Sequence, residues 1–197
     1  MIHDVSNAIR FVKANDKKYH IDPENLIVWG ETHGSYLGCL IGIYGGTGKI
    51  DDPDCPYKDC DSRVKAVIDY WAFTDFLTIY HERLNDPNRD PNVPLTEELI
   101  FRKTGKELEE ELSKQLMPTE DICGSEPPFY ILHGELDKNI PRRCSEIYYE
   151  KLKNAGVEAY LEIVKDTPHS LANYRYGWQI EGTYEFIHHI FGGKETE

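Results

Sequence analysis

The sequence lacks the features that would send it into or across a membrane. No apolar run approaches the length of a membrane span, and residues 1–4 lack the basic-then-apolar order of a secretory signal. Positive charge is also scarce, because 22 Lys and Arg residues stand against 35 Asp and Glu residues, for a formal net charge of −13. An acidic surface of this size disfavours nucleic acid and anionic membranes as partners. We therefore expect a soluble, cytoplasmic chain, with export still open if a leader was removed.

Cysteine pairs of the metal-binding kind are absent as well. Five cysteines occur without any Cys-x-x-Cys, which argues against zinc and leaves at least one thiol unpaired: Cys39, Cys55, Cys60, Cys123 and Cys144. A disulfide within the polar loop 51–62 is possible in an oxidising compartment, although reduced thiols are the simpler interpretation. The aspartates of this loop do not follow EF-hand spacing, so a solvated acidic loop is favoured over a calcium site. No metal or cofactor is expected.

Segments whose apolar residues have helical spacing alternate along the chain with short apolar runs typical of strands. The length of 197 residues predicts one domain, 1–197, with enough chain to bury a core. Apolar steps of three and four, or nearly continuous apolar stretches, predict helices at 4–19, 34–44, 145–154 and 180–191. Short apolar runs predict strands at 26–29, 64–71, 129–132 and 159–164. This order predicts an α/β fold in which a mainly parallel sheet of about four strands is flanked by helices.

A long polar segment interrupts this alternation. Residues 75–122 are rich in charge, with a loop at 86–91 and one or two helices within 95–116. Leucines repeat there at steps of four, at Leu108, Leu112 and Leu116. An insertion this long between strands is best interpreted as a helical cap or lid, whose amphipathic helix covers the site. A solvated surface excursion is the alternative.

The most informative stretch is 25–36, which runs from a buried strand through a sharp turn into a helix. Gly30 and Gly34 bracket Thr32 in the strand–turn–helix pattern that lifts a nucleophile above the carboxyl edge of a parallel sheet. The usual residue at that apex is serine. A β-branched residue with positive φ is strained, and the extra methyl of threonine crowds the direction of attack on a carbonyl.

Three side chains at the carboxyl ends of strands have the types of a catalytic triad. Thr32 follows the first strand, Asp137 the third and His169 the fourth, in the chain order expected of an α/β-hydrolase. A hydroxyl needs an imidazole to take its proton, and the imidazole needs a carboxylate to fix its tautomer. The backbone N–H of His33 is the expected oxyanion donor.

Substrate-binding candidates surround these residues. Tyr70, Trp71 and Phe73 follow the second strand at its carboxyl end, where ligands bind in open α/β sheets. Glu31, beside the apex, is a further candidate. Core packing is at least as good an interpretation for any one of the aromatic residues.

Several short motifs, in order, resemble the α/β-hydrolase esterases related to acetyl-ester and feruloyl-ester hydrolases, and more distantly prolyl-oligopeptidase-type hydrolases. They are Asp-Pro-Glu-Asn-Leu-Ile-Val-Trp-Gly-Glu at 22–31, Ser-Arg-Val-Lys-Ala-Val at 62–67, Thr-Asp-Phe at 74–76, Pro-Pro-Phe at 127–129, His-Gly at 133–134, Asp-Lys-Asn-Ile-Pro at 137–141, Lys-Asn-Ala-Gly-Val at 153–157 and Pro-His at 168–169. The resemblance covers the carboxyl-terminal two thirds of that family. It implies Thr32 as nucleophile, Asp137 as acid and His169 as base.

The chain departs from this family at the elbow and at its beginning. The family carries serine at position 32, a small residue at 33 and glycine at 35, where this chain has Thr32, His33 and Ser35. The family's first strands, with the loop that supplies a second oxyanion donor, would precede residue 1. Strand 26–29 is therefore expected to be an exposed apolar edge, and we predict a homodimer or higher oligomer that pairs near it.

Two functions follow from these observations. The leading one is hydrolysis of small acyl esters by a Thr(Ser)-Asp-His triad through an acyl-enzyme intermediate. The alternative is a catalytically inactive relative or truncated product that serves as a binding or oligomerisation module, since a fold alone does not determine activity.

Overall fold

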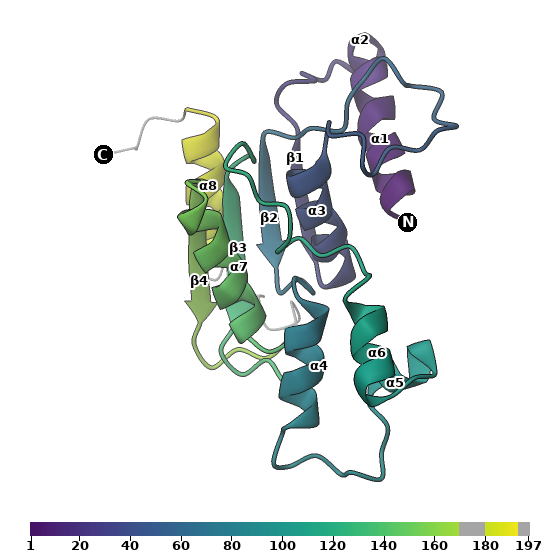
Figure 1. Ribbon diagram of the computed structural model, residues 1–197. Helices are drawn as coiled ribbons and strands as arrows, with labels where there is room; N and C mark the ends of the chain where they lie inside the picture. The colour runs from purple at the N-terminus through teal and green to yellow at the C-terminus, as the bar shows by residue number, and fades with distance from the viewer. Residues whose placement is uncertain (170–179, 193–197) are drawn as a thin grey trace.

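The computed structural model describes residues 1–169 and 180–192, which form a helix–sheet–helix arrangement (Figure 1). Its centre is a four-stranded parallel sheet in the order β1-β2-β3-β4, made of β1 (Ile27–Glu31), β2 (Ala66–Tyr70), β3 (Phe129–Gly134) and β4 (Ala159–Val164). The predicted α/β fold with a four-stranded parallel sheet is thus confirmed. Because the strands are parallel, all four carboxyl ends lie at one edge of the sheet.

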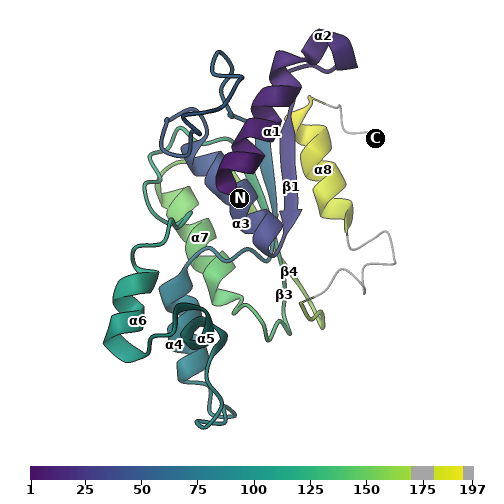
Figure 2. The ribbon, with the colours of Figure 1, turned by 90° about the vertical axis from the view of Figure 1, so that its right-hand side faces the viewer.

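Helices cover both faces of the sheet. On one face α3 (His33–Tyr44) packs on β1 and β2, while α7 (Arg143–Asn154) packs on β3 and β4. The long helix α1 (Ile2–Ala14), followed by the short α2 (Asp16–Tyr19), packs against α3. The opposite face is covered by α8 (Glu181–Ile190), and Figure 2 shows β1 between the two helical layers.

Alternation along the strands divides the core into two layers. In β2, Val67 points toward the α3 and α7 side, whereas its neighbours Ala66 and Ile68 point toward α8. Phe129 in β3 lies in the first layer and Tyr130 in the second. Every residue of β2 and β3 is buried, as expected for central parallel strands.

The close approach of α3 to the sheet requires two glycines that sequence periodicity did not single out. A Cβ at Gly38 would lie 2.7 Å from Cγ1 of Val28, and one at Gly42 would lie 2.5 Å from Cζ of Phe129. Both distances are far inside van der Waals contact. The helix therefore fits against β1 and β2 because it has no side chain at these positions.

Residues 75–122 contain three helices that lie beyond the carboxyl ends of the strands: α4 (Phe76–Leu84), α5 (Thr96–Phe101) and α6 (Gly105–Leu112) (Figures 1 and 2). They share a small core of their own, in which Tyr80 of α4 packs with Leu108 and Leu112 of α6. Asp75 caps α4 by accepting the N–H of Thr78 at 3.0 Å. The sequence pattern indicated the two later helices but not α4.

The ends of several elements differ from the sequence expectations. The predicted helix 4–19 is divided after Ala14, and its second part ends at His20, which has a left-handed backbone with φ of 56°. Strands β1 and β3 extend to Glu31 and Gly134, two residues beyond the predicted runs. These extensions are held by parallel pairing with β2 and β4, which an apolar run does not reveal.

Strand β1 forms one edge of the sheet, as predicted. Within residues 1–169 and 180–192 it pairs with β2 alone. Its Trp29 side chain is 47% exposed and touches the ring of Tyr70, with 5.6 Å between centroids. A large apolar side chain therefore lies beside unpaired backbone groups at this edge.

All five cysteines carry free thiols, including Cys55 and Cys60 of the loop 51–62. In the described ranges, no helix combines the length and the apolar character needed to cross a bilayer.

The tight contact of α3 with the sheet predicts how much an added methyl group in this helix lowers the free energy of unfolding. Gly42→Ala should lower the free energy of unfolding by about 1–3 kcal/mol, because the new Cβ meets Phe129 and Val67 in the core. Gly34→Ala is the matched control in the same helix, since a Cβ there has open space. It should be neutral or raise stability by up to about 1 kcal/mol. Urea unfolding measures both, and equal stabilities of the two variants would contradict the packing described.

Candidate active site

The turn between β1 and α3 places Thr32 at its apex. Thr32 has φ of 56° and ψ of −117°, a conformation that residues with a side chain seldom adopt. Its N–H donates to the carbonyl oxygen of Tyr70 at 3.0 Å, which ties the apex to the end of β2. A Cβ at Gly30 would lie within 2.6 Å of Gly34 and Ser35 backbone atoms, so the turn requires glycine there. Gly34 faces open space, so the second glycine of the motif is not required sterically.

A buried hydrogen-bond network holds the first turn of α3 against β2. Ser35 is fully buried, donates to Oδ1 of Asp69 at 2.5 Å and accepts the N–H of Tyr70 at 3.0 Å. The same carboxylate oxygen accepts the N–H of Ala72 at 2.9 Å. Burial raises the pKa of Asp69 above its usual value, although hydrogen bonds from Ser35 and Ala72 oppose the shift. Ser35 thus fastens the elbow from inside the helix.

Thr32, His169 and Asp137 lie together at the carboxyl edge of the sheet. Oγ1 of Thr32 is 3.2 Å from Nε2 of His169, and Nδ1 of His169 is 2.7 Å from Oδ2 of Asp137. The residues are separated by 137 and 32 positions along the chain. The His169 side chain is 13% exposed and that of Asp137 is fully buried, so the ring alone connects the carboxylate with the apex.

The carboxylate of Asp137 is surrounded by donors. Oδ1 accepts the N–H groups of Asn139 and Ile140 at 2.8 and 2.9 Å, while Oδ2 faces His169 and the buried His133. Burial raises the pKa of Asp137, but the hydrogen bonds from the two imidazoles and two N–H groups outweigh it. The net effect is a pKa well below the usual value. The group is therefore an ionised acceptor at neutral pH, as required to orient an imidazole.

His33 begins α3 directly after the apex. Its ring is exposed and lies against Phe73, with centroids 4.5 Å apart. Its N–H belongs to the first turn of the helix, and the Thr32 side chain makes no capping hydrogen bond within the described residues. The N–H of His33 thus lies in the unpaired first turn of a helix, beside the Thr32 hydroxyl.

The other predicted substrate-binding residues lie in different environments. Trp71, with φ of 45°, is 1% exposed and its ring lies 5.6 Å from that of His169. Tyr70 is fully buried on the α8 side and bonds Oγ1 of Thr183 at 2.6 Å, which corresponds to core packing. Glu31 is exposed at the end of the edge strand β1. Trp71 therefore lies against the His169 ring and Phe73 against the His33 ring, whereas the Tyr70 side chain lies in the core.

Residues 75–122 are linked to the loop that carries Asp137. Arg83 of α4 donates to the carboxylate of Glu97 and to the carbonyl oxygen of Asn139. Because the N–H of Asn139 donates to Asp137, one residue connects α4 with the Asp137 carboxylate. No sequence motif indicated this contact, which depends on the fold of residues 75–122.

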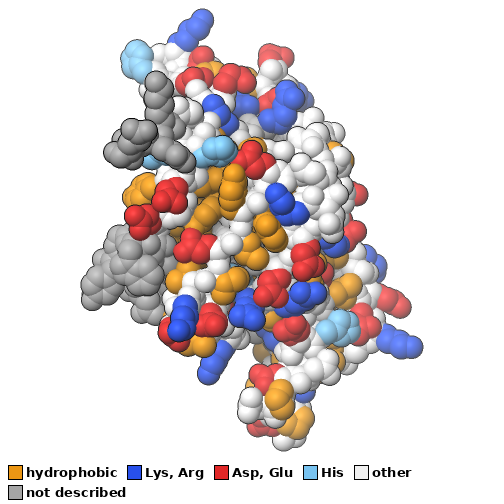
Figure 3. All heavy atoms as spheres, turned by 90° about the vertical axis from the view of Figure 1, so that its left-hand side faces the viewer, with side chains coloured by type: hydrophobic (Ala, Val, Ile, Leu, Met, Phe, Trp, Pro, Cys, Tyr) orange, Lys and Arg blue, Asp and Glu red, His pale blue; other side chains and the backbone are white. Residues whose placement is uncertain are grey.

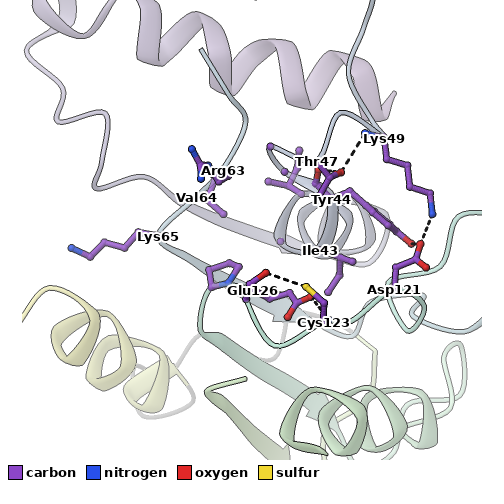
Figure 4. Close-up of a pocket in the computed structure, with 16 residues that line it drawn as sticks. Ile43, Tyr44, Thr47, Lys49, Arg63, Val64, Lys65, Asp121, Cys123 and Glu126 are labelled. Carbon is purple, nitrogen blue, oxygen red and sulfur yellow. Dashed lines mark hydrogen bonds and ion pairs between the residues drawn. The ribbon is translucent and has the colours of Figure 1, made fainter. Parts of the chain in front are cut away.

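A sizeable cavity lies at the other end of the sheet. It has a volume of about 750 Å³ and is lined by the end of α3 and the segments that enter β2 and β3 (Figure 4). The length of α3, about 18 Å for twelve residues, separates it from Thr32. Its Lys49 is paired with Asp121, as Figure 4 shows, and Arg63 is paired with Asp61. Among the described residues, no three His, Cys, Asp or Glu side chains form a group able to hold a metal.

The low pKa of Asp137 predicts how stability depends on acid. An ionised, hydrogen-bonded carboxylate stabilises the fold above its unfolded pKa of about 4, and this contribution is lost as pH falls toward the folded pKa. The difference in unfolding free energy between the chain and Asp137→Asn should therefore be constant above about pH 5 and shrink below pH 4. Urea unfolding across this pH range tests it. Asp59→Asn, in the exposed part of the loop 51–62, is the control; a difference for Asp137 that does not vary with pH would contradict the prediction.

Comparisons with known proteins find esterases among the proteins that this chain resembles. The probable carboxylic ester hydrolase LipM of Mycobacterium tuberculosis is 24% identical over 155 residues, which are 79% of this chain and 34% of LipM. A truncated carbohydrate esterase from gut microbiota has a TM-score of 0.79 at 24% identity, over 96% of this chain and 67% of that one. Apo esterase 2 of Thermogutta terrifontis has a TM-score of 0.71 at 20% identity, over 100% of this chain and 66% of that one.

The chain thus spans about a third of the length of the curated relatives that it matches. Its fold is that of the α/β-hydrolase esterases, as the sequence motifs indicated. Residues 1–152 match the sequence profile of the BD-FAE family. The chain belongs to the BD-FAE family.

Proposed function

We propose that this chain is a carboxylic ester hydrolase acting on small acyl esters. The observation that carries the proposal is the hydrogen-bonded series Thr32–His169–Asp137, with distances of 3.2 and 2.7 Å, at a left-handed strand–helix turn. The relatives named as esterases support the same class of reaction. Because the chain covers only part of these proteins, its activity stays a proposal.

The proposed reaction begins with the proton of the Thr32 hydroxyl. His169 donates from Nδ1 to Asp137, so Nε2 of the neutral ring is free to accept that proton. Oγ1 then bonds to the ester carbonyl carbon, and the carbonyl electron pair moves to oxygen, where the N–H of His33 stabilises it. When the carbon–oxygen bond breaks, Nε2 returns the proton to the departing alcohol. Water, deprotonated by the same ring, then bonds to the acyl carbon; the bond from that carbon to Oγ1 breaks, Nε2 returns the proton to Oγ1, and the acid leaves.

The surroundings of the apex favour a small substrate. The ring of His33, the residue that follows Thr32, packs on Phe73, and its proposed effect is to narrow the space next to the reacting hydroxyl. The proposed role of residues 75–122 is to cover this edge, since α4 to α6 lie beyond the carboxyl ends of the strands (Figure 1). Arg83 would couple that cover to the loop of Asp137.

The net charge and the free thiols bear on the partners and the compartment that we propose for this chain. With a net charge of −13, and with basic side chains lying among acidic ones on the face of Figure 3, nucleic acid and anionic membranes are poor partners. The free thiols of Cys55 and Cys60 fit a reducing compartment such as the cytoplasm.

Turnover of p-nitrophenyl acetate tests the proposed nucleophile. Thr32→Ser should raise kcat/KM, by up to about a hundredfold, because it removes the methyl that displaces the hydroxyl or the acyl carbon from the attack geometry. His169→Ala and Asp137→Asn, each combined with Thr32→Ser, should return the rate toward background. If neither the chain nor Thr32→Ser exceeds the His169→Ala rate, the hydrolase proposal fails.

A second proposal rests on the exposed edge. Strand β1 presents unpaired backbone groups and the half-exposed Trp29, and Thr32 is a strained nucleophile. If the hydrolase proposal fails, the chain would be an inactive relative, or a truncated product, that acts as a binding module. In either case we propose that a second copy pairs with the β1 edge.

Light scattering tests this association. The chain should have at least twice the mass of 22.8 kDa, and Trp29→Lys should shift it toward the monomer, because a charge on an edge strand opposes strand pairing. Tyr160→Lys is the matched control, since Tyr160 is 44% exposed on β4 at the opposite edge. A monomeric mass for the unaltered chain would contradict the proposal.

A further inference from the structure

His133 is a second, fully buried imidazole behind the proposed acid. It lies near the end of β3, four residues before Asp137, and none of its surface is exposed. Its Nε2 is 3.0 Å from the carbonyl oxygen of Ile140 and 3.2 Å from Oδ2 of Asp137. Its Nδ1 is 2.7 Å from Oγ of Ser145, a fully buried residue of α7.

These partners determine where the ring carries its proton. The carbonyl of Ile140 and the ionised carboxylate of Asp137 are both acceptors, so Nε2 must carry hydrogen. In the neutral ring Nδ1 is then an acceptor, and the hydroxyl of Ser145 is the group that donates to it. The two acceptors thereby select the Nε2–H tautomer, and the hydroxyl of Ser145 on α7 holds the ring on β3 by its hydrogen bond to Nδ1.

The arrangement leaves the Asp137 carboxylate no freedom to rotate. Oδ1 accepts two backbone N–H groups, from Asn139 and Ile140. Oδ2 accepts from Nδ1 of His169 at 2.7 Å, and it also lies 3.2 Å from Nε2 of His133, whose single N–H is shared with the carbonyl oxygen of Ile140. The two imidazoles approach the same oxygen from the ends of neighbouring strands, β3 and β4.

We propose that His133 is a positioning residue, which through the Ser145 hydrogen bond holds the Asp137 carboxylate in the orientation that His169 requires. The role of His133 in turnover rests on the proposed function. Its effect on the His169–Asp137 hydrogen bond does not. A buried histidine that only fills the core would leave the His169–Asp137 hydrogen bond unchanged when replaced by a side chain of similar size.

Histidine-selective ¹⁵N NMR tests, without any turnover, whether His133 affects the hydrogen bond between His169 and Asp137. In the unaltered chain, His133 should show the single tautomer protonated at Nε2, and His169 should show a strongly hydrogen-bonded Nδ1–H. His133→Phe keeps an aromatic ring but removes the donor, so the Nδ1–H signal of His169 should shift upfield or broaden. His133→Gln, whose amide reaches the position of Nε2, should restore it.

Ser145→Ala is a second variant in case His133→Phe does not fold. It should leave the Nε2–H tautomer of His133 in place, because both acceptors remain, but release the ring from α7 and shift the His169 signal in the same direction. Ser6→Ala is its matched control, because Ser6 is buried in α1 and its hydroxyl has no hydrogen-bond partner among the described residues. An unchanged Nδ1–H signal in folded His133→Phe or Ser145→Ala would overturn the proposal, as would its absence from the unaltered chain.

Rates of ester hydrolysis, measured for His133 variants that also carry Thr32→Ser, distinguish the positioning role of His133 from the proposed function of the chain. His133→Phe should lower kcat about tenfold, the value of one charge-assisted hydrogen bond, with KM unchanged, and His133→Gln should recover most of that loss. If no variant turns over ester while the NMR pattern is as expected, the proposed function fails and the positioning role stands. A loss of kcat that His133→Gln does not recover would overturn the positioning role.

Discussion

The hydrogen bond between Nδ1 of His169 and Oδ2 of Asp137 is the interaction on which the candidate site depends. It connects the ends of β3 and β4 and fixes the ring whose other nitrogen faces Thr32. The bond is short and the carboxylate fully buried, so its strength derives from a dry environment in which four donors hold the acceptor. Burial alone would favour the protonated acid; the donors reverse that preference and keep the group ionised.

The second constraint is steric and lies at the elbow. Thr32 holds a left-handed backbone because its N–H bonds Tyr70, Gly30 allows α3 to approach β1, and the buried Ser35–Asp69 pair fastens the first turn. A β-branched residue in this conformation costs free energy that the surrounding contacts must supply. The same contacts leave the hydroxyl of Thr32 at the rim, 3.2 Å from Nε2 of His169.

Much of this could be predicted from the sequence, because apolar periodicity and strand order carry the fold. Parallel strands bring their carboxyl ends to one edge, so placing Thr32, Asp137 and His169 after strands was enough to predict their proximity. Packing partners could not be predicted in the same way. Gly42 faces Phe129, Tyr70 lies in the core and Ser145 reaches His133 because of how α3, α8 and α7 lie on the sheet, which no local pattern encodes. Helix α4 was missed; its apolar residues face two small clusters, Tyr80 packing with Leu108 and Leu112 and Ile79 with Ile140 and Cys144.

The hydroxyl of Thr32 is the group that we propose His169 activates. A fluorophosphonate probe, followed by peptide mass spectrometry, tests this directly because it marks the residue whose oxygen attacks. We expect a single adduct on Thr32 that disappears in His169→Ala. An adduct on another residue, or one on Thr32 that persists at the same rate without His169, would contradict it.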